Sequence, residues 1–453
     1  MFASLELVRR TLEGTPFENK AFLVGGAVRD HLLGLPFAGD LDIVIEGDAL
    51  EVAKLMTERA GATDPQVYPR FGTAMVHLDG QKIEFASARS ESYDENSRKP
   101  HASPATLLED MSRRDFTVNA LMLDLNTLEP VDLLGSGLSD LKAKILRTPL
   151  DPEKTFSDDP LRMLRAVRFR HKLGFEFADG LREAIKSMAF RLEIISGERI
   201  AEELSQMLAR PTAADALQDL HDLDLLKHFW PEFHELDGVE QGKFHYLDAW
   251  NHTVEVVRGL TGEPLPIVLS GLFHDVAKGR TRTVDDKGDV HFYRHDDIGA
   301  EMAREMLRRI KMPNEIIDEV ALLVSNHMRL SGSKNYSDSA ARRLIKAMGE
   351  SLDGFFALVQ SDRAAHAAGL TDQDLDEIKA QVERVRTATP IERLQSPLTG
   401  EEIMSLLELT PGPKVGKVKD HLMELVLEGT LKPDDKTSAV EAAKSYWRTE
   451  LAP

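Results

Sequence analysis

Two carboxylates stand close together near the start of the chain, in a segment that is otherwise apolar. Asp40 and Asp42 flank a leucine, and the run Ile43-Val44-Ile45 follows them directly. Residues two apart in a β-strand point to the same side, so both carboxylates are expected side by side at the entrance of a strand. Two like charges there repel each other unless a divalent cation lies between them. Phosphoryl transfer uses such a cation, so we predict Asp40 and Asp42 as catalytic metal ligands.

A pair of glycines precedes this segment. Gly25 and Gly26 follow an expected strand over 21–24 and open an expected helix that includes Arg29. Glycines allow the backbone to approach a ligand closely, and the free N–H groups of a helix start can bind anionic oxygens. Alone, this pattern fits a tight structural turn equally well, but the carboxylates downstream favour a triphosphate site. Glu84, on another expected strand, is either a third carboxylate near the metals or a surface residue.

Basic side chains gather on one predicted helix after residue 160. Arg162, Arg165 and Arg168 fall within one arc of about 120°, and apolar residues occupy the opposite side. Between residues 142 and 172 the chain has nine Lys or Arg and four Asp or Glu. This stripe is either an ordinary solvated face or a surface for RNA or a triphosphate. Asp159, just before it, adds a hydrogen-bond acceptor to the donors of Arg162.

A second group of polar residues has the composition of a metal site. A lone histidine is more often structural, but an adjacent His-Asp pair on an apolar helix costs free energy to bury unless a metal or other partners satisfy it. Imidazole and carboxylate ligands suit Mn, Ni, Fe, Zn or Mg. The group comprises His252, His274, Asp275, His295, His327 and Asp362.

The elements that must position these residues differ between the two parts of the chain. Before residue 150, helical spacing is expected over 50–60, and Asp79-Gly80 favours a hairpin turn. After Pro152 the strand signals nearly vanish, and amphipathic helical patterns continue to the end. The expected strands are 21–24, 42–45, 75–78, 82–86 and 119–125. We therefore predict an α+β fold, with domains over 1–150, 151–215, 216–370 and 371–453.

The composition limits the function further. The chain has 453 residues, no cysteine and a net charge of −20. The lack of cysteine excludes disulfides and Cys-ligated zinc and fits a reducing cytosol. The net charge excludes a globally basic nucleic-acid binder, so a nucleic-acid site must be a local patch. The N-terminus lacks the features of a signal peptide, and no apolar run approaches the roughly 20 residues that span a bilayer, so we expect a cytoplasmic protein with no membrane contact.

The motifs around these residues resemble a known family. The Gly-Gly and Asp-x-Asp motifs and the stretches 113–121 and 158–162 are similar to the polymerase beta-like nucleotidyltransferases. The similar branch contains bacterial tRNA nucleotidyltransferases (CCA-adding enzymes) and bacterial poly(A) polymerases. The resemblance implies a nucleotidyltransferase head, an all-α neck, an HD body and a helical tail at the boundaries given above. It also implies Mg²⁺ in the head, CTP and ATP as substrates, and the 3′ end of tRNA as acceptor.

The resemblance also implies roles for individual residues. Arg114 would lie near the phosphates, while Asp115 and Asn119 would select a ribonucleotide by its 2′-hydroxyl. Asp159 and Arg162 would bond the base edges of CTP or ATP in place of a template. The family pattern Glu-Asp-x-x-Arg begins here with an aspartate, a mild departure, and the stretch 198–204 is similar to a helix-stabilising motif. The predicted nucleotide-binding residues are Gly25, Gly26, Arg29, Arg114, Asp115, Asn119, Asp159, Arg162, Arg165 and Arg168.

The histidines and aspartates are similar in spacing to the HD superfamily of metal-dependent phosphohydrolases. This resemblance implies a divalent metal (Ni, Mn, Mg or Zn) and a second, phosphohydrolase activity. A subgroup of bacterial tRNA nucleotidyltransferases has such a domain, so both sites fit one protein. The implied metal ligands are His252, His274, Asp275 and Asp362, with His295 and His327 as further ligands or phosphate contacts.

We predict template-independent addition of C, C and A to tRNA. Alternatives with the same chemistry are CC-only or A-only addition, and a bacterial poly(A) polymerase. The last usually has a basic C-terminal extension, whereas residues 401–453 here carry a net charge of −3. A nucleotide phosphohydrolase is disfavoured by the intact Asp pair, and an inactive RNA-binding scaffold by two acidic metal sites. No protein partner is evident from the sequence.

Overall fold

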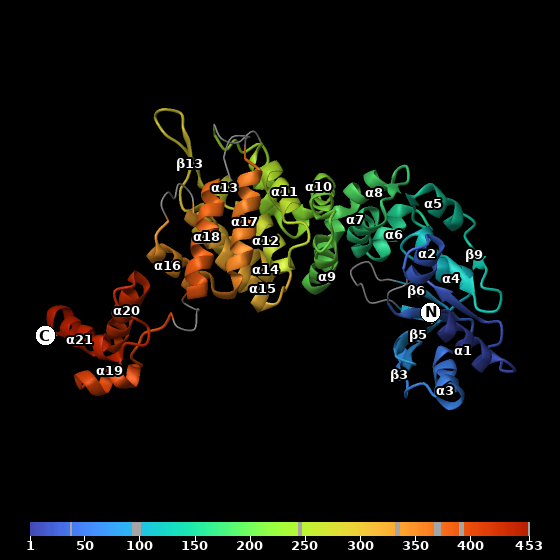
Figure 1. Ribbon diagram of the computed structural model, residues 1–453. Helices are drawn as coiled ribbons and strands as arrows, with labels where there is room; N and C mark the ends of the chain where they lie inside the picture. Colours follow the sequence, from blue (N-terminus) through green and yellow to red (C-terminus); the bar gives the residue numbers. More distant parts are fainter. Residues whose placement is uncertain are drawn as a thin grey trace. The chain divides into compact units, whose positions relative to one another are not determined.

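The computed structural model describes residues 1–36, 39–92, 101–242, 247–330, 336–366, 373–388 and 394–451. The chain forms two compact units: Met1–Pro231 with Arg309–Lys311, and Glu232–Arg308 with Met312–Pro453. The predicted α+β class is confirmed, because the main sheet lies in the first unit and helices form most of the rest (Figure 1). The finer division into four domains stays a prediction.

A seven-stranded sheet forms the head. Only β2 (Leu41–Ile45) and β5 (Gln81–Ser87) pair in parallel within it, in the part of the chain that the structure describes. Asp79 and Gly80 both have positive φ, as a two-residue type I′ turn requires, so the predicted hairpin is confirmed. In spatial order the strands are β3 (Gln66–Tyr68), β4 (Thr73–Leu78), β5 (Gln81–Ser87), β2 (Leu41–Ile45), β1 (Ala21–Val24), β8 (Met122–Asp124) and β9 (Pro130–Val131).

One predicted strand is shorter than expected. The sequence predicts a strand over 119–125, but pairing begins at Met122, and Thr117–Asn119 forms a 3₁₀ turn. Thr117 Oγ1 donates to Asp140 at 2.7 Å, and Asn119 Nδ2 donates to Asp115 at 3.0 Å. These buried side-chain hydrogen bonds compete with the strand ladder, so the prediction is wrong for the first residues.

Helices and an apolar cluster support this sheet. α3 (Ala49–Ala60) packs on β4 and β5, and α1 (Phe2–Leu12) packs on α3. Val44 shares a face of β2 with Asp42, and it packs in a buried cluster with Val24 and Met122. The core therefore anchors the strand ends that carry the predicted carboxylates. The other head elements are α2 (Gly26–Leu32), β6 (Arg89–Ser92), β7 (His101–Pro104), α4 (Leu107–Ser112), α5 (Gly137–Ala143) and β10 (Ile145–Leu146).

Five helices follow the head sheet in the first unit, and we call them the neck helices. They are α6 (Pro152–Asp158), α7 (Leu161–Leu173), α8 (Leu181–Met188), α9 (Gly197–Leu208) and α10 (Ala213–Asp222). α7 packs against both α9 and α10. Arg162 and Arg168 are buried in this packing, so the basic stripe of α7 is not an ordinary solvated face. β11 (Glu176–Phe177) pairs with β10, a short pairing that the helical pattern did not predict.

The second unit is mostly helical. α12 (Leu265–Phe273) packs on α11 (Ala249–Gly259), α15 (Asn314–Asn326) and α17 (Leu352–Ala364). The hairpin of β12 (Arg282–Val284) and β13 (Val290–Phe292) interrupts the predicted run of helices. No helix among the residues described above is long and apolar enough to cross a membrane. Its elements are α11 (Ala249–Gly259), α12 (Leu265–Phe273), α13 (Lys278–Thr281), β12 (Arg282–Val284), β13 (Val290–Phe292), α14 (His295–Arg309), α15 (Asn314–Asn326), α16 (Asp338–Met348), α17 (Leu352–Ala364), α18 (Gln373–Ala388), α19 (Gly400–Leu407), α20 (Pro413–Glu428) and α21 (Lys436–Tyr446).

Candidate functional site

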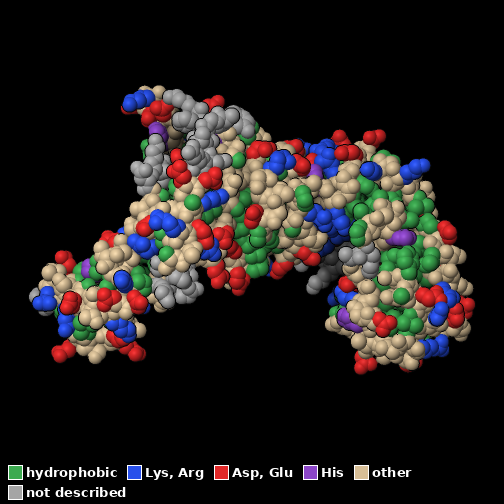
Figure 2. Space-filling view, in the orientation of Figure 1, with side chains coloured by type: hydrophobic (Ala, Val, Ile, Leu, Met, Phe, Trp, Pro, Cys, Tyr) green, Lys and Arg blue, Asp and Glu red, His purple; other side chains and the backbone are tan. Residues whose placement is uncertain are grey.

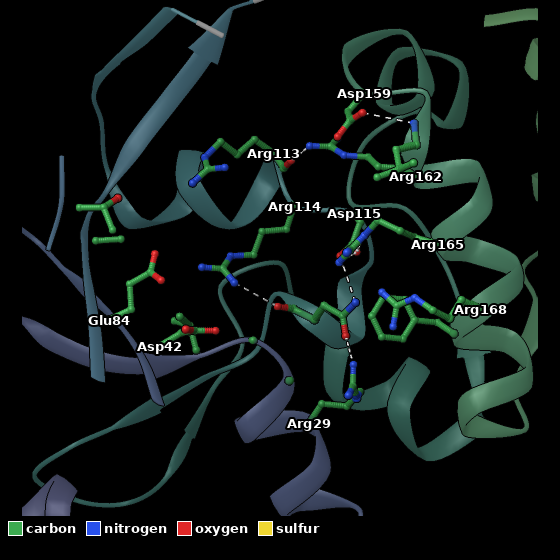
Figure 3. Close-up of a pocket in the computed structure, with 18 of the residues that line it drawn as sticks. Arg29, Asp42, Glu84, Arg113, Arg114, Asp115, Asp159, Arg162, Arg165 and Arg168 are labelled. Atoms are coloured by element: carbon green, nitrogen blue, oxygen red, sulfur yellow. Dashed lines mark hydrogen bonds and ion pairs between the residues drawn. The ribbon is translucent and has the colours of Figure 1, made fainter. Parts of the chain in front are cut away.

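A cavity of about 640 Å³ lies between the head strands and the neck helices of the first unit. Figure 3 shows Asp42 and Glu84 on the strand side and the arginines of α7 on the helix side. Figure 2 shows a group of Lys and Arg side chains on the surface beside the neck helices. All ten predicted nucleotide-binding residues line the cavity: Gly25, Gly26, Arg29, Arg114, Asp115, Asn119, Asp159, Arg162, Arg165 and Arg168.

Asp42 and Glu84 stand opposite each other on neighbouring parallel strands. The register of β2 and β5 pairs the two residues directly. Although the Asp42 side chain is open to the cavity, desolvation by the surrounding walls and the negative charge of Glu84 raise its pKa to about 6. A divalent cation would relieve this concentration of negative charge, so the donor set fits Mg²⁺. Glu84 thus lines the cavity and is not on an outer surface.

Asp40 lies next to this pair but does not line the cavity. Its exposed carboxylate forms an ion pair with Lys82 Nζ at 2.5 Å. Its charge also contributes to the raised pKa of Asp42. The predicted pair Asp40 and Asp42 is therefore present at the start of β2, but Glu84 is the register partner of Asp42. Sequence reasoning could not rank these carboxylates, because strand register is a long-range property.

The turn between β1 and α2 brings the backbone close to charged side chains. Gly25 has a φ of +74°, a conformation that residues with a side chain rarely adopt. A Cβ there would lie 3.6 Å from Arg114 Nη1 and 3.7 Å from Asp42 Oδ2. Because Gly25 has no side chain, the space between the Arg114 guanidinium and the Asp42 carboxylate stays open. Arg114 could bind phosphate oxygens in this space, and Asp42 could hold a divalent cation there.

A chain of hydrogen bonds links α2, the 3₁₀ turn and α7. Arg29 Nη1 donates to Asn119 Oδ1 at 2.5 Å, and Asn119 Nδ2 donates to Asp115 Oδ1 at 3.0 Å. Arg165 Nη2 binds the other Asp115 oxygen at 2.6 Å. Burial opposes the charge on Asp115, but Arg165 and Asn119 hold the pKa of its carboxyl below the usual range. The ionised carboxylate therefore fixes the orientation of the Asn119 amide at the cavity.

The ring of Phe169 stands among three guanidinium groups. Those of Arg168, Arg29 and Arg165 lie 4.4, 5.0 and 5.3 Å from its centroid. Glu203 of α9 neutralises Arg168 at 2.5 Å. Phe169 also lines the cavity, and sequence reasoning missed it because an apolar residue on a helix signals only core packing.

Asp159 and Arg162 reach the neck end of the cavity but bind different partners. Arg199 of α9 binds both Asp159 oxygens, at 3.3 and 2.7 Å. Arg162 is buried and donates to the carbonyls of Thr155 at 3.4 Å and Arg113 at 2.5 Å. Sequence reasoning placed Arg199 only in a helix-stabilising stretch. Its contact with Asp159 depends on how α9 packs on α7, which no local pattern shows.

The predicted HD residues meet in the second unit. They form two triads in which the ligand atoms lie within 4.8 Å of one another. One triad is His252, His274 and Asp362, and the other is Asp275, His295 and His327. A cavity of about 270 Å³ opens onto the second triad and Asp362. All six predicted residues are thus brought together, from five helices or their ends.

The ring nitrogens of this cluster are arranged as metal ligands. Nδ1 of His274, His295 and His327 lies 2.8, 2.8 and 2.6 Å from the carbonyl oxygen three residues earlier. A carbonyl only accepts, so each Nδ1 donates, and a neutral ring keeps its lone pair on Nε2. The Nε2 atoms of His295 and His327 face each other at 3.2 Å, where a cation would satisfy both lone pairs. The donor set therefore fits a divalent transition metal.

Lys278 lies at the same cluster and was missed in the sequence. Its Nζ is 2.6 Å from Asp275 Oδ2. Burial opposes the charge on Asp275, but His274 and Lys278 hold the pKa of its carboxyl well below its usual range. The sequence does contain a signal for this ion pair, because Lys278 follows Asp275 by three residues, about one helical turn.

Family models match three parts of the chain. The poly A polymerase head domain matches residues 21–147, the probable RNA and SrmB-binding site of polymerase A matches 174–236, and the HD domain matches 244–364. The first match covers the carboxylates of the head, and the third covers all six HD residues.

Relatives extend the match along nearly the whole chain. An A-adding tRNA nucleotidyltransferase of Deinococcus radiodurans is 35% identical over 432 residues, 92% of this chain and 94% of that protein. A CC-adding tRNA nucleotidyltransferase of Thermus thermophilus is 32% identical over 441 residues, 94% of each chain. The Bacillus stearothermophilus CCA-adding enzyme in complex with CTP shares the fold, with a TM-score of 0.71 and 24% identity over 99% of this chain and 98% of that one. The chain therefore belongs to the family of bacterial tRNA nucleotidyltransferases and poly(A) polymerases, in the branch with an HD domain.

Proposed function

We propose that the chain adds C, C and A to the 3′ end of tRNA from CTP and ATP, without a template. The observation that carries this proposal is one cavity lined by a carboxylate pair, Asp42 and Glu84, and by Asp159 and Arg162. On their Watson–Crick edges cytosine and adenine both present an amine beside a ring acceptor, whereas guanine and uracil do not. A carboxylate accepts from the amine and a guanidinium donates to the ring nitrogen, so the pair is suited to both bases.

In this proposal the chain binds the triphosphate and ribose through residues of the head. Gly25 leaves space for the phosphates beside Arg114, and Asn119, oriented by Asp115, would bond the 2′-hydroxyl. Bound Mg²⁺ would stabilise charge on the attacking and leaving oxygens as pyrophosphate departs.

The carboxylates would hold that Mg²⁺. Asp42 and Glu84 already face the cavity. Asp40 would also bind the Mg²⁺ ion, after its ion pair with Lys82 is broken.

A partial activity is the second candidate. The two relatives described above are an A-adding and a CC-adding enzyme, and they align with 92% and 94% of this chain. The experiment is extension of three tRNAs, ending before CCA, after C and after CC, with each NTP supplied separately. Full CCA addition extends the first two with CTP and the third with ATP. An A-only enzyme extends only the third, a CC-only enzyme stops after the second C, and a poly(A) polymerase adds repeated A to unrelated RNA.

We also propose phosphohydrolase activity at the HD cluster, on 2′,3′-cyclic or terminal phosphates. The support is the buried set of imidazoles whose Nε2 atoms converge beside a cavity. A bound transition metal would polarise the ester and activate water. The test is chelator-treated protein reloaded with Ni²⁺, Mn²⁺, Mg²⁺ or Zn²⁺ and offered bis-p-nitrophenyl phosphate and 2′,3′-cyclic AMP.

A further inference from the structure

Arg199 stands in a place where a cation needs an acidic partner. It is the third residue of α9, after the N-cap Ser196. A helix N-terminus carries partial positive charge, so a cation in the first turn is unfavourable there. The carboxylate of Asp159 lies against its guanidinium, and both side chains line the cavity. The ion pair, rather than the helix, accounts for an arginine at this position.

The contacts of Asp159 leave one acceptor site on its carboxylate. Oδ1 accepts from the backbone N–H of Leu161 at 3.2 Å and from Arg199 Nη1 at 3.3 Å. Oδ2 accepts from Arg199 Nη2 at 2.7 Å. Each carboxylate oxygen accepts about two hydrogen bonds, so Oδ2 keeps one acceptor site for a ligand. The Asp159 side chain is 19% exposed, and the residue lines the cavity.

We propose that Arg199 is a positioning residue for base selection, because it fixes the direction in which Asp159 accepts a hydrogen bond. The inference rests on the proposed role of Asp159 at the base edge. The χ2 torsion of an aspartate is broad, so a carboxylate without Arg199 would rotate and accept from differently placed donors, including the ring N–H of guanine or uracil. Arg162 cannot take over this role, because its guanidinium is bound to the carbonyls of Thr155 and Arg113.

The test compares Arg199→Ala, Arg199→Lys and Asp159→Ala in the full chain. Arg191→Ala is the matched control, since Arg191 is also a neck arginine and donates to the Ser157 carbonyl at 3.2 Å, but does not line the cavity. The measured quantities are kcat and KM for all four NTPs, on the tRNA acceptors that the wild type extends. The preferences are the kcat/KM ratios of CTP over UTP and ATP over GTP.

Arg199→Ala should lower each preference by about tenfold or more, since small misplacements of a positioning group have effects of this size. Arg199→Lys should lie between it and the wild type, because an ammonium cannot bind both carboxylate oxygens in the bidentate geometry. Arg191→Ala should keep the wild-type ratios. If Arg199→Ala does not fold, Arg199→Gln takes its place, and its kcat/KM ratios are compared with those of Arg199→Lys and the wild type.

Two outcomes separate this inference from the function on which it rests. Wild-type ratios in Arg199→Ala, together with lowered ratios in Asp159→Ala, would overturn the positioning role alone. Unchanged ratios in Asp159→Ala would overturn the base-reading proposal itself, and the role of Arg199 with it.

Discussion

Asp42 and Glu84 are direct register partners on the parallel strands β2 and β5, and both line the same cavity. Two carboxylates from different strands thus face one space, and Glu84 contributes to the raised pKa of Asp42, about 6. The arrangement is electrostatically unfavourable for the protein alone and favourable for a protein that binds a divalent cation.

Asp42→Asn and Glu84→Gln should each remove a metal ligand. We expect tRNA extension to fall by about 10³-fold or more in Asp42→Asn, since metal stabilisation of transition-state charge contributes several kcal/mol. Thermal melting without Mg²⁺ should show an equal or higher Tm, because a like-charge repulsion is removed. Extension at near wild-type rate by a folded Asp42→Asn would refute the metal assignment.

Asp40 has two candidate roles that one comparison separates. If Asp40 is a metal ligand, Asp40→Ala should nearly abolish extension, whereas Lys82→Ala should leave most of the activity. If Asp40 only pairs with Lys82, both variants should show the same small effect, since an exposed ion pair contributes about 1 kcal/mol or less. Single-turnover extension rates at saturating Mg²⁺ are the measurement.

Arg162→Ala should erode the preference for CTP and ATP along with the rate. Because the buried guanidinium donates to two backbone carbonyls, the variant should also lose about 1 to 3 kcal/mol of stability. Rates should therefore be compared at a temperature where melting curves show both proteins folded. An unchanged NTP preference would mean that Arg162 acts only in the packing of the neck.

His274→Ala combined with Asp275→Ala should abolish phosphate-ester hydrolysis and leave tRNA extension nearly intact, because the two sites belong to different units. Metal analysis should show loss of bound transition metal, and chelation should lower the Tm of the wild type by removing a ligand of the folded state. If no metal supports hydrolysis of any ester by the wild type, the HD cluster is a structural platform.

Asp219 should make the neck sensitive to acid. It binds His171 at 2.7 Å, Arg182 at 3.1 Å and Arg170, and although burial opposes its charge, His171 and Arg170 lower its pKa to about 2. A lowered folded-state pKa stabilises the protein above the unfolded pKa near 4, and the stabilisation is lost as pH falls from about 4 to 2.

Denaturant unfolding of Asp219→Asn tests this effect. At pH 7 the variant should be less stable by about 1 to 2 kcal/mol, and the difference should shrink below pH 4. Asp179→Asn, at an exposed neck position, is the control and should follow the wild type at every pH. A difference that does not depend on pH would assign the effect of Asp219 to packing.

Local patterns in the sequence were sufficient for much of the fold and for most candidate residues. The strand that ends at Val24, the turn at Gly25 and the hairpin at Asp79-Gly80 depend on backbone preferences of a few neighbouring residues. Helical periodicity likewise predicted the helices that follow residue 150, and the His-Asp pair predicted a metal cluster. These features are short-range, so one stretch of chain contains all the information that specifies them.

Long-range packing decided the partners within each site. Glu84 faces Asp42 because of strand register, Arg199 reaches Asp159 because α9 packs on α7, and Arg29 meets Asn119 across 90 positions of the chain. The 3₁₀ turn that replaces part of a predicted strand has the same origin, since Asp115 and Asp140 bind its side chains. Such contacts form when segments that are far apart in the sequence pack together. The residue types and spacing within one segment do not specify which other segment it packs against.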